Sequence, residues 1–305
     1  MRMIPIVLFL AACLAGSLLA AQEKPSRPRI TGIDHVRVYV SNLDKSREFY
    51  SNILGLLSAD YRCSGPSRSC FAVRWAPKQH VELEQAPSSA PKNWLAEVAF
   101  TTENVPQMRR YLLAHGIKVG AISKGADYTE HFELRDPGGN PISFVGYPGL
   151  IPIDDPPPLH AVGERLIHAG FVVENLTAEN HFYIDLLGFR LYWHGGFKDQ
   201  DTDWYEIQVP DGDNWIEYML NIPANADHKE LGVQNHFSLG VKDVQAAAAQ
   251  LRKNGLQTFD GPEIGRDGKN SLDAYDPDGT RIEVMEFTPA KPPCCHPYTA
   301  EHPKP

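Results

Sequence analysis

Alternating apolar runs and amphipathic segments follow one another in the same order four times along this chain. Each repeat opens with a strand-like alternation, of which Val36-Arg37-Val38 is an example, and passes into an amphipathic segment that stops at a glycine. Further strand-like runs follow, with a tight turn before the last one. The four amphipathic segments, expected as helices, are 44–54, 106–115, 177–187 and 243–254. Such a regular period predicts an internal repeat whose unit is βαβββ.

The ends of these elements carry local signals. Asp44, Thr177 and Asp243 are expected N-caps, because their side-chain oxygens can accept a first-turn N–H. The turns at 136–139 and 276–279 read Asp-Pro-Gly-Gly and Asp-Pro-Asp-Gly. Proline with a fixed φ and a following glycine suit a tight reversal between antiparallel strands. We therefore expect a hairpin before the last strand of each unit.

The repeats fall into two halves. A proline-rich stretch with five prolines between 148 and 158 is the expected linker, because few packed elements tolerate such a composition. The predicted organisation is a signal peptide at 1–21, a first domain at 30–148, a linker at 149–163, a second domain at 164–288 and a Pro/Cys tail at 289–305.

The N-terminus predicts export. Arg2 precedes an apolar stretch that ends at Ala20-Ala21, as in a cleavable secretory signal, so no membrane-spanning segment is expected after cleavage. Leu10-Ala11-Ala12-Cys13 also resembles a lipoprotein box, so a protein anchored through Cys13 is the alternative to a periplasmic or secreted one.

Composition limits the number of domains and the class of partner. The chain has 305 residues, of which 42% are hydrophobic and 22% charged, which is enough for two cores. A net charge of −9 argues against nucleic acid as a partner, because phosphates require a basic surface. A small-molecule substrate is the expected partner. The sequence leaves open whether the protein forms a homodimer.

The cysteines leave alternatives. Cys63 and Cys70 flank a turn and could close it by a disulfide, which an exported protein would retain. Cys294-Cys295-His296 lies in the tail, where a metal or redox role competes with an irregular tail carrying an incidental thiol pair. The second interpretation is favoured.

A histidine and a glutamate recur at nearly fixed spacing in three of the four units. The pairs are His35 with Glu82, His168 with Glu217 and His236 with Glu283, at separations of 47, 49 and 47 positions. Imidazole nitrogen and carboxylate oxygen together form a ligand set for divalent transition metals. One histidine in a strand is usually a core or surface residue whose ring nitrogens are hydrogen-bonded, and a glutamate in a strand usually faces solvent. Recurrence at the same place in three units favours a metal site.

At these residues the chain resembles the vicinal oxygen chelate (VOC) superfamily, which includes glyoxalase I, extradiol dioxygenases and bleomycin-resistance proteins. The resemblance covers about 33–287 and is carried by Asp34-His35-Val36, Phe49-Tyr50, Leu54-Gly55-Leu56, His168, Phe182-Tyr183, Leu187-Gly188-Phe189 and the Asp-Pro-x-Gly turns. It implies an α+β fold in which four βαβββ units form two glyoxalase-like VOC domains with cupped mixed sheets. One scaffold of this kind hosts many reactions.

By the same resemblance, ligands come from the first and last strands of each unit. In the C-terminal half these positions hold His168, Glu217, His236 and Glu283, which we expect to bind the metal. In the N-terminal half they hold His35, Glu82, Glu97 and Ser143; serine is a poor ligand, so this site is expected to be degenerate. Pairing of unit one with unit four is the alternative, with His35, Glu82, His236 and Glu283 as ligands.

The expected cofactor is one divalent ion: Zn, Ni, Fe, Mn or Co. The resemblance implies a lyase or isomerase of glyoxalase type, in which Glu217 or Glu283 acts as the base. An extradiol dioxygenase using His168, His236 and Glu283 is the second reading, although the family's catalytic tyrosine and acid–base histidine would fall at Asp273 and Asn214. His194 and Tyr275 are nearby candidates for these roles.

A third reading is a non-catalytic binding or resistance protein. Its pocket would be lined by aromatic residues of unit three, namely Trp193, Trp204, Tyr205, Trp215 and Tyr218, which core packing explains equally well.

Overall fold

The computed structural model describes residues 25–63, 66–73, 79–89, 91–125, 128–149 and 159–305. The predicted signal peptide, Cys13 and most of the expected linker lie outside these residues. No helix among the described residues is long and apolar enough to cross a membrane.

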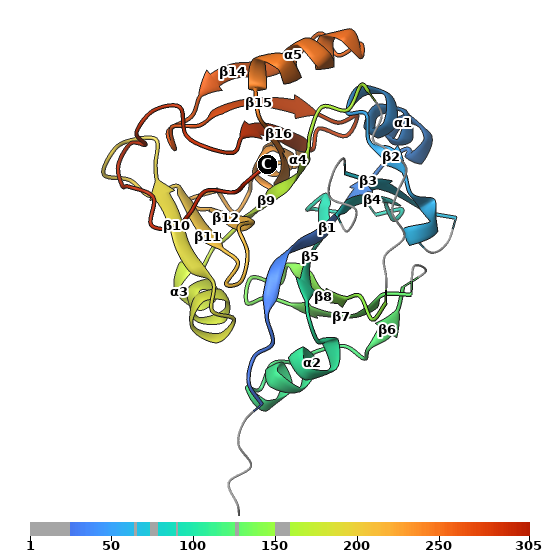
Figure 1. Ribbon diagram of the computed structural model, residues 1–305, viewed down its shortest axis with the longest axis vertical. Helices are drawn as coiled ribbons and strands as arrows, with labels where there is room; N and C mark the ends of the chain where they lie inside the picture. Colours follow the sequence, from blue (N-terminus) through green and yellow to red (C-terminus); the bar gives the residue numbers. More distant parts are fainter. Residues whose placement is uncertain (1–24, 64–65, 74–78, 90, 126–127, 150–158) are drawn as a thin grey trace, which may run out of the picture.

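The N-terminal half forms one curled sheet, in which the described residues supply eight strands (Figure 1). Their order is β2-β3-β4-β1-β5-β8-β7-β6. The strands are β1 (Ile30–Val40), β2 (Leu57–Ser58), β3 (Arg68–Ala72), β4 (His80–Gln85), β5 (Leu95–Thr102), β6 (Ser123–Lys124), β7 (Glu130–Arg135) and β8 (Pro141–Gly146). Strands β1 and β5 are the first strands of units one and two, and they pair with each other.

The C-terminal half repeats this order as β10-β11-β12-β9-β13-β16-β15-β14. The strands are β9 (Arg165–Val172), β10 (Arg190–Gly195), β11 (Trp204–Gln208), β12 (Trp215–Met219), β13 (His236–Val241), β14 (Asp260–Ile264), β15 (Asn270–Tyr275) and β16 (Arg281–Glu286). Units therefore pair within each half, and unit one does not share a sheet with unit four. The α+β fold of two cupped mixed sheets is confirmed.

Four helices among the described residues follow the expected segments, with differences at their ends, and a fifth, at His228–Gln234, was not expected. They are α1 (Leu43–Glu48), α2 (Val105–Ala114), α3 (Leu176–Asn180), α4 (His228–Gln234) and α5 (Val244–Lys253). Helices α1 and α3 continue as π-helical turns at Phe49–Ile53 and His181–Leu186, and Asp60–Arg62 is a 3₁₀ turn. The glycines predicted to end the four helices all have positive φ, as a left-handed C-terminal residue requires.

Two of the three predicted N-caps are wrong. Asp243 does accept hydrogen bonds from the first turn of α5. Helix α1, however, is capped by Asn42, whose side chain accepts from the backbone N–H of Lys45, and α3 is capped in the same way by Asn175. Asparagine caps as well as aspartate or threonine do, and here it comes two residues earlier, so the helices begin earlier.

The two halves contact each other through equivalent residues. The Tyr50 hydroxyl donates to Asp276 Oδ2 and the Tyr183 hydroxyl donates to Asp136 Oδ2, both at 3.2 Å. Each tyrosine lies on the first helix of its half, and each aspartate begins an Asp-Pro turn of the other half. Figure 1 accordingly shows α1 beside the C-terminal domain. The Phe-Tyr pairs and Asp-Pro turns of the repeat thus join the two domains.

Glu179 makes this contact sensitive to pH. Its side chain is buried and its Oε1 accepts from the backbone N–H of Gly138 at 2.6 Å. Burial, aided by the nearby Asp136, raises the pKa of Glu179 to about 8. Because the folded state holds this proton more tightly than the unfolded state, Glu179 costs stability as the pH rises from about 5 to 8.

We therefore expect Glu179→Gln, which keeps the acceptor oxygen, to stabilise the protein at pH 8 by about 1–3 kcal/mol. The gain should vanish at pH 5, where the wild-type carboxyl is protonated as well. Urea denaturation at the two pH values measures both quantities, with the exposed Glu174→Gln as control. An equal effect at both pH values would contradict this explanation.

The tail differs from the favoured interpretation. It contains no helix or strand, but it packs on β10, where the Tyr298 ring lies 4.7 Å from that of Tyr192. The Trp193 indole N–H donates to the carbonyl of His296. Cys294 and Cys295 form a disulfide with each other, so the thiol pair is not free. The sequence lacked a signal for this packing, because its apolar partners lie about 100 positions upstream.

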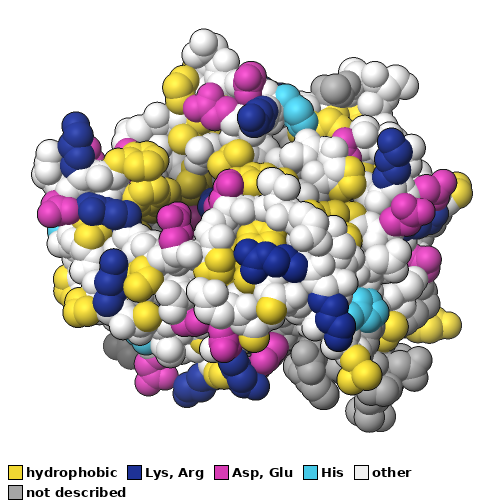
Figure 2. Space-filling view, turned by 90° about the horizontal axis from the view of Figure 1, so that it is seen from above, with side chains coloured by type: hydrophobic (Ala, Val, Ile, Leu, Met, Phe, Trp, Pro, Cys, Tyr) yellow, Lys and Arg dark blue, Asp and Glu magenta, His cyan; other side chains and the backbone are white. Residues whose placement is uncertain are grey.

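Charged side chains of both signs are interspersed on the face of the molecule that Figure 2 shows.

Candidate metal centre

The C-terminal cup brings His168, Glu217, His236 and Glu283 together from four adjacent strands. Glu217 and His236 both lie directly opposite Gly170 on the central strand β9. His168, two positions before Gly170, lies opposite Ser238, which in turn lies opposite Glu283. Because residues two apart face the same side of a strand, all four side chains point to the concave face.

The donor atoms converge. His168 Nε2 lies 3.0 Å from His236 Nε2 and 3.2 Å from a carboxylate oxygen of Glu283. Glu217 Oε2 lies 3.3 Å from His236 Nε2 and 3.9 Å from His168 Nε2. Neighbouring ligands of a tetrahedral metal are about 3.3 Å apart when each bond is about 2.0 Å long. Donor atoms of His168, Glu217 and His236 all lie within 4.8 Å of one another, while Glu283 reaches the group from the side of His168.

The two histidines are in the neutral state that metal binding requires. Burial lowers the pKa of His168 to about 3 and also lowers the pKa of His236, where the charge of Arg281 adds to the effect. His236 Nδ1 lies 3.0 Å from the carbonyl oxygen of Gln234. An N–H donated to that carbonyl would leave the lone pair of Nε2 for a metal, in place of the contacts that Nε2 makes with Glu217 and Arg281. Both imidazoles are therefore neutral and able to act as ligands.

The two carboxylates differ. Burial alone would raise the pKa of Glu217, but the contact with His236 and the charge of Arg281 hold it below its usual value. Burial raises the pKa of Glu283, against the opposing charge of Arg281. Glu217 is thus the more firmly ionised carboxylate of the two.

A cavity of about 390 Å³ opens onto Glu217 and Glu283. Its other lining residues include Trp193, Phe197, Trp204, Glu206, Arg266, Asp273 and Arg281. The Arg281 guanidinium lies against the His236 ring, with Nη2 2.9 Å from both ring nitrogens, and its Nη1 is 3.5 Å from Asp273. The sequence reasoning missed Arg281, although its place two residues before Glu283 on β16 signals the same face.

Gly170 makes room for this centre. A β-carbon at this position would overlap the His236 imidazole, so any larger residue would push the ring away. The glycine therefore belongs to the site, although it carries no ligand atom.

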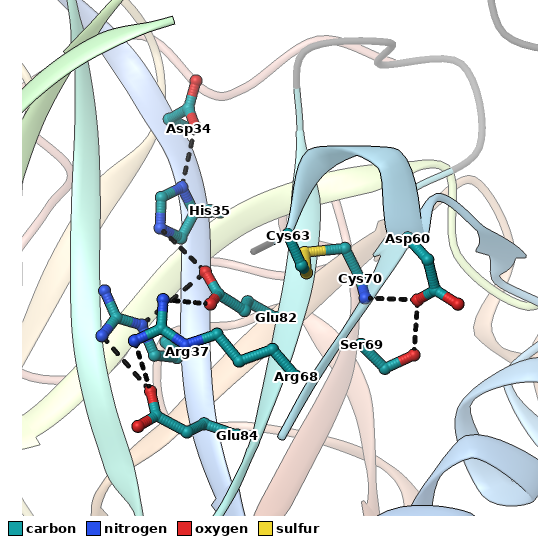
Figure 3. Close-up of a disulfide and its surroundings, with 10 residues drawn as sticks. All are labelled: Asp34, His35, Arg37, Asp60, Cys63, Arg68, Ser69, Cys70, Glu82 and Glu84. Atoms are coloured by element: carbon teal, nitrogen blue, oxygen red, sulfur yellow. Dashed lines mark hydrogen bonds and ion pairs between the residues drawn. A yellow bond between two sulfur atoms is a disulfide. The ribbon is translucent and has the colours of Figure 1, made fainter. Parts of the chain in front are cut away.

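The N-terminal cup holds an arginine at the equivalent position. Arg37 on β1 lies directly opposite Glu82 and Glu97, as Gly170 lies opposite Glu217 and His236. Its guanidinium forms an ion pair with Glu97 and lies 3.7 Å from Glu82 and 3.4 Å from Glu84. Figure 3 shows it beside Glu82 and Glu84, together with Arg68, which pairs with Glu82 at 2.8 Å. Two of the four positions expected of a degenerate site, Glu82 and Glu97, thus face a guanidinium, and the fourth position holds Ser143.

Several other candidates lie outside the C-terminal cup or have other partners. Asn214 is buried between the domains, where its Oδ1 accepts from the backbone N–H of Ile33 and its amide donates to the carbonyl of Leu166. His194 stacks on His296, and the Tyr275 hydroxyl donates to Asp260. Asp273 does line the cavity and faces Arg281.

The aromatic cluster of unit three is divided. Trp193 and Trp204 line the cavity. Trp215 and Tyr218 are fully buried, and Tyr205 packs against Tyr218, so these three belong to the core. Cys63 and Cys70 form a disulfide beside the N-terminal cup (Figure 3).

A family comparison matches both halves of the chain, at residues 32–144 and 165–284, to the Glyoxalase/Bleomycin resistance protein/Dioxygenase superfamily. The chain belongs to this superfamily. No curated protein sequence matches it. The assignment agrees with the repeated βαβββ unit and the ligand positions described above.

Solved structures of superfamily members have the same fold at low sequence identity. The 2,3-dioxygenase LapB from Pseudomonas sp. KL28 is 18% identical, with a TM-score of 0.66, over 92% of this chain and 96% of that one. The Mn(II)-bound glyoxalase from Novosphingobium aromaticivorans is 20% identical, with a TM-score of 0.65, over 85% and 83%. The homoprotocatechuate 2,3-dioxygenase from Brevibacterium fuscum, in complex with 3,4-dihydroxyphenylacetate, is 18% identical, with a TM-score of 0.63, over 86% and 82%.

The C-terminal residues fit the metal that these relatives imply. Two neutral imidazoles and two carboxylates offer a mixed N/O donor set, and the carbonyl of Gln234 lies within hydrogen-bonding distance of His236 Nδ1. The donor set is compatible with several divalent transition metals.

Proposed function

We propose that the protein is a metal-dependent lyase or isomerase that acts on a small molecule with two adjacent oxygens. This proposal is supported by the convergence of His168, Glu217, His236 and Glu283, of which the two glutamates line a cavity. A divalent ion held there would polarise the substrate oxygens and stabilise the negative charge that develops on them.

Glu283 is the proposed base. It lies at the edge of the group formed by the other three ligands, and it lines the cavity from which a substrate would approach. A carboxylate in this position can take a proton from carbon next to a carbonyl group and return it to the neighbouring carbon. Glu217, held between the two histidines, keeps the role of ligand. Arg281, beside Glu283, would stabilise the negative charge of the substrate.

Isotope exchange tests this assignment. We expect the wild-type protein, loaded with Mn²⁺, to exchange the α-proton of hydroxycarbonyl compounds with D₂O, as followed by NMR. Glu283→Gln should lower the rate by about 10²–10⁴-fold, the range typical of a general base. Glu263→Gln is the matched control, because Glu263 lines the same cavity but does not reach the histidines. Unchanged exchange in Glu283→Gln would refute the assignment of the base.

Ring cleavage is the second candidate. Two histidines and one carboxylate, as in the group His168, Glu217 and His236, are also a ligand set for non-haem iron. Against this reading, Asn214 is engaged at the domain boundary and Asp273 faces Arg281, so neither position supplies the acid–base group of a dioxygenase. Oxygen uptake with catechols, without proton exchange, would show that the protein is a ring-cleaving dioxygenase.

We retain export to the periplasm or medium as part of the proposal, on the strength of the N-terminal sequence.

A further inference from the structure

Beside Arg37 and the carboxylates that pair with it, the N-terminal cup contains a second group of potential metal ligands. Asp34, His35 and His80 are all buried, and one donor atom of each lies within 4.8 Å of the others. Only His35 among them occupies a ligand position of the superfamily; Asp34 and His80 do not.

A bulge in β1 produces this arrangement. Ile33 pairs with Phe100 and His35 pairs with Ala99, so Asp34 is an extra residue in the strand. Its carboxylate therefore lies beside the side chain that follows it, and Asp34 Oδ1 is 2.8 Å from His35 Nδ1 (Figure 3). His80 on the neighbouring strand β4 lies directly opposite His35, and the two rings stack at 4.5 Å.

The C-terminal domain has apolar residues at the same two positions. Strand β9 has an equivalent bulge, where the extra residue is Ile167, and the residue opposite His168 is Trp215. The N-terminal domain thus has a carboxylate and an imidazole in place of two apolar side chains. Both differences lie next to His35, which occupies the same position in the N-terminal domain as His168 does in the C-terminal domain.

The carboxylate is oriented and the group is accessible. Asp34 Oδ2 accepts a hydrogen bond from the Tyr147 hydroxyl at 2.6 Å, and Thr101 Oγ1 lies 3.5 Å from the same oxygen. Such outer contacts fix a ligand carboxylate in place. Asp34, His35 and His80 line a cavity of about 250 Å³ through which an ion and water can enter.

We propose that Asp34, His35 and His80 form a second divalent-metal site, in the half of the chain where Arg37 faces the carboxylates at two ligand positions of the superfamily, Glu82 and Glu97. Two imidazoles and one carboxylate suit Zn²⁺, Fe²⁺, Co²⁺ or Mn²⁺ and leave coordination positions for water or a ligand. Binding would displace the proton that Asp34 and His35 share. This site does not depend on the function proposed for the C-terminal cup.

The test uses the full chain with the C-terminal cup disabled by His168→Ala and His236→Ala. The Cys63–Cys70 disulfide is kept oxidised, because free thiols beside Glu82 would add ligands. We expect this protein to bind one equivalent of Co²⁺, seen as a visible absorption band, and one equivalent of Zn²⁺ by equilibrium dialysis. Asp34→Asn and His80→Asn, each added to this background, should remove the binding.

His131→Ala is the matched control, because His131 lines the same cavity outside the group of three. It should leave the stoichiometry at one. A rise in melting temperature with Zn²⁺, present in the background protein and absent in the Asp34 and His80 variants, separates lost binding from lost folding.

The proposal is overturned if the background protein binds no metal, or if both variants retain it. In the first case Asp34 would only balance the charge of Arg62, which acts on it from within the same cavity. In the wild-type chain, one equivalent that survives His236→Ala would support the N-terminal site even if the C-terminal cup proved inactive.

Discussion

Replacing Arg37 with methionine should destabilise the N-terminal domain by about 3–5 kcal/mol, the usual cost of removing one partner of a buried ion pair. Glu97 is 3% exposed and Glu82 is 6% exposed, and both face the guanidinium. Arg68 would still pair with Glu82, but Glu97 would keep a buried charge without another cation paired to it among the residues that the structure describes. Urea denaturation at pH 7 measures the loss.

A comparison with an exposed ion pair makes this result specific. Arg47→Met removes an exposed pair with Asp44 on α1 and should change stability by no more than about 0.5 kcal/mol. A loss below about 1 kcal/mol at pH 7 would mean that Arg37 is not the cation on which the N-terminal cup depends.

The sequence allowed the repeat, the sheet class and the convergence of His168, Glu217, His236 and Glu283 to be predicted. Alternation along a strand determines which residues share a face, and His168 and Glu217 are each set within apolar runs that only a sheet explains. The glycines that end the helices could also be predicted from the sequence, because the left-handed conformation of a residue's own backbone favours glycine.

The remainder depends on partners that are distant in sequence. Arg37 looked like an ordinary polar position on a strand, and only the pairing of β1 with β5 shows that Glu97 lies opposite it. The importance of Gly170 likewise follows from the His236 ring on another strand. The group of Asp34, His35 and His80 requires both a bulge and a parallel neighbour, neither of which leaves a periodic signal.

Replacing His236 or Glu283 with alanine should remove the metal from the C-terminal cup. His236 Nε2 and the Glu283 carboxylate both lie within about 3.3 Å of other donors, so either change removes a ligand from the set. Loss of a partner that merely orients a ligand costs about 10–100-fold in affinity, so loss of the ligand itself should cost at least 100-fold. Proton exchange should be lost with it.

His194→Ala is the matched control for these variants. It lies on β10 of the same domain, stacks on His296 and contributes no donor to the group. It should retain both the metal and the activity of the wild-type protein.

Anomalous diffraction from crystals loaded with Mn²⁺ tests the central claim most directly. We expect an anomalous peak in the C-terminal cup, within bonding distance of His168 Nε2, His236 Nε2 and the carboxylates of Glu217 and Glu283, and we expect it to be absent from His236→Ala crystals. A wild-type map without this peak, or a peak that persists in the variant, would contradict the account.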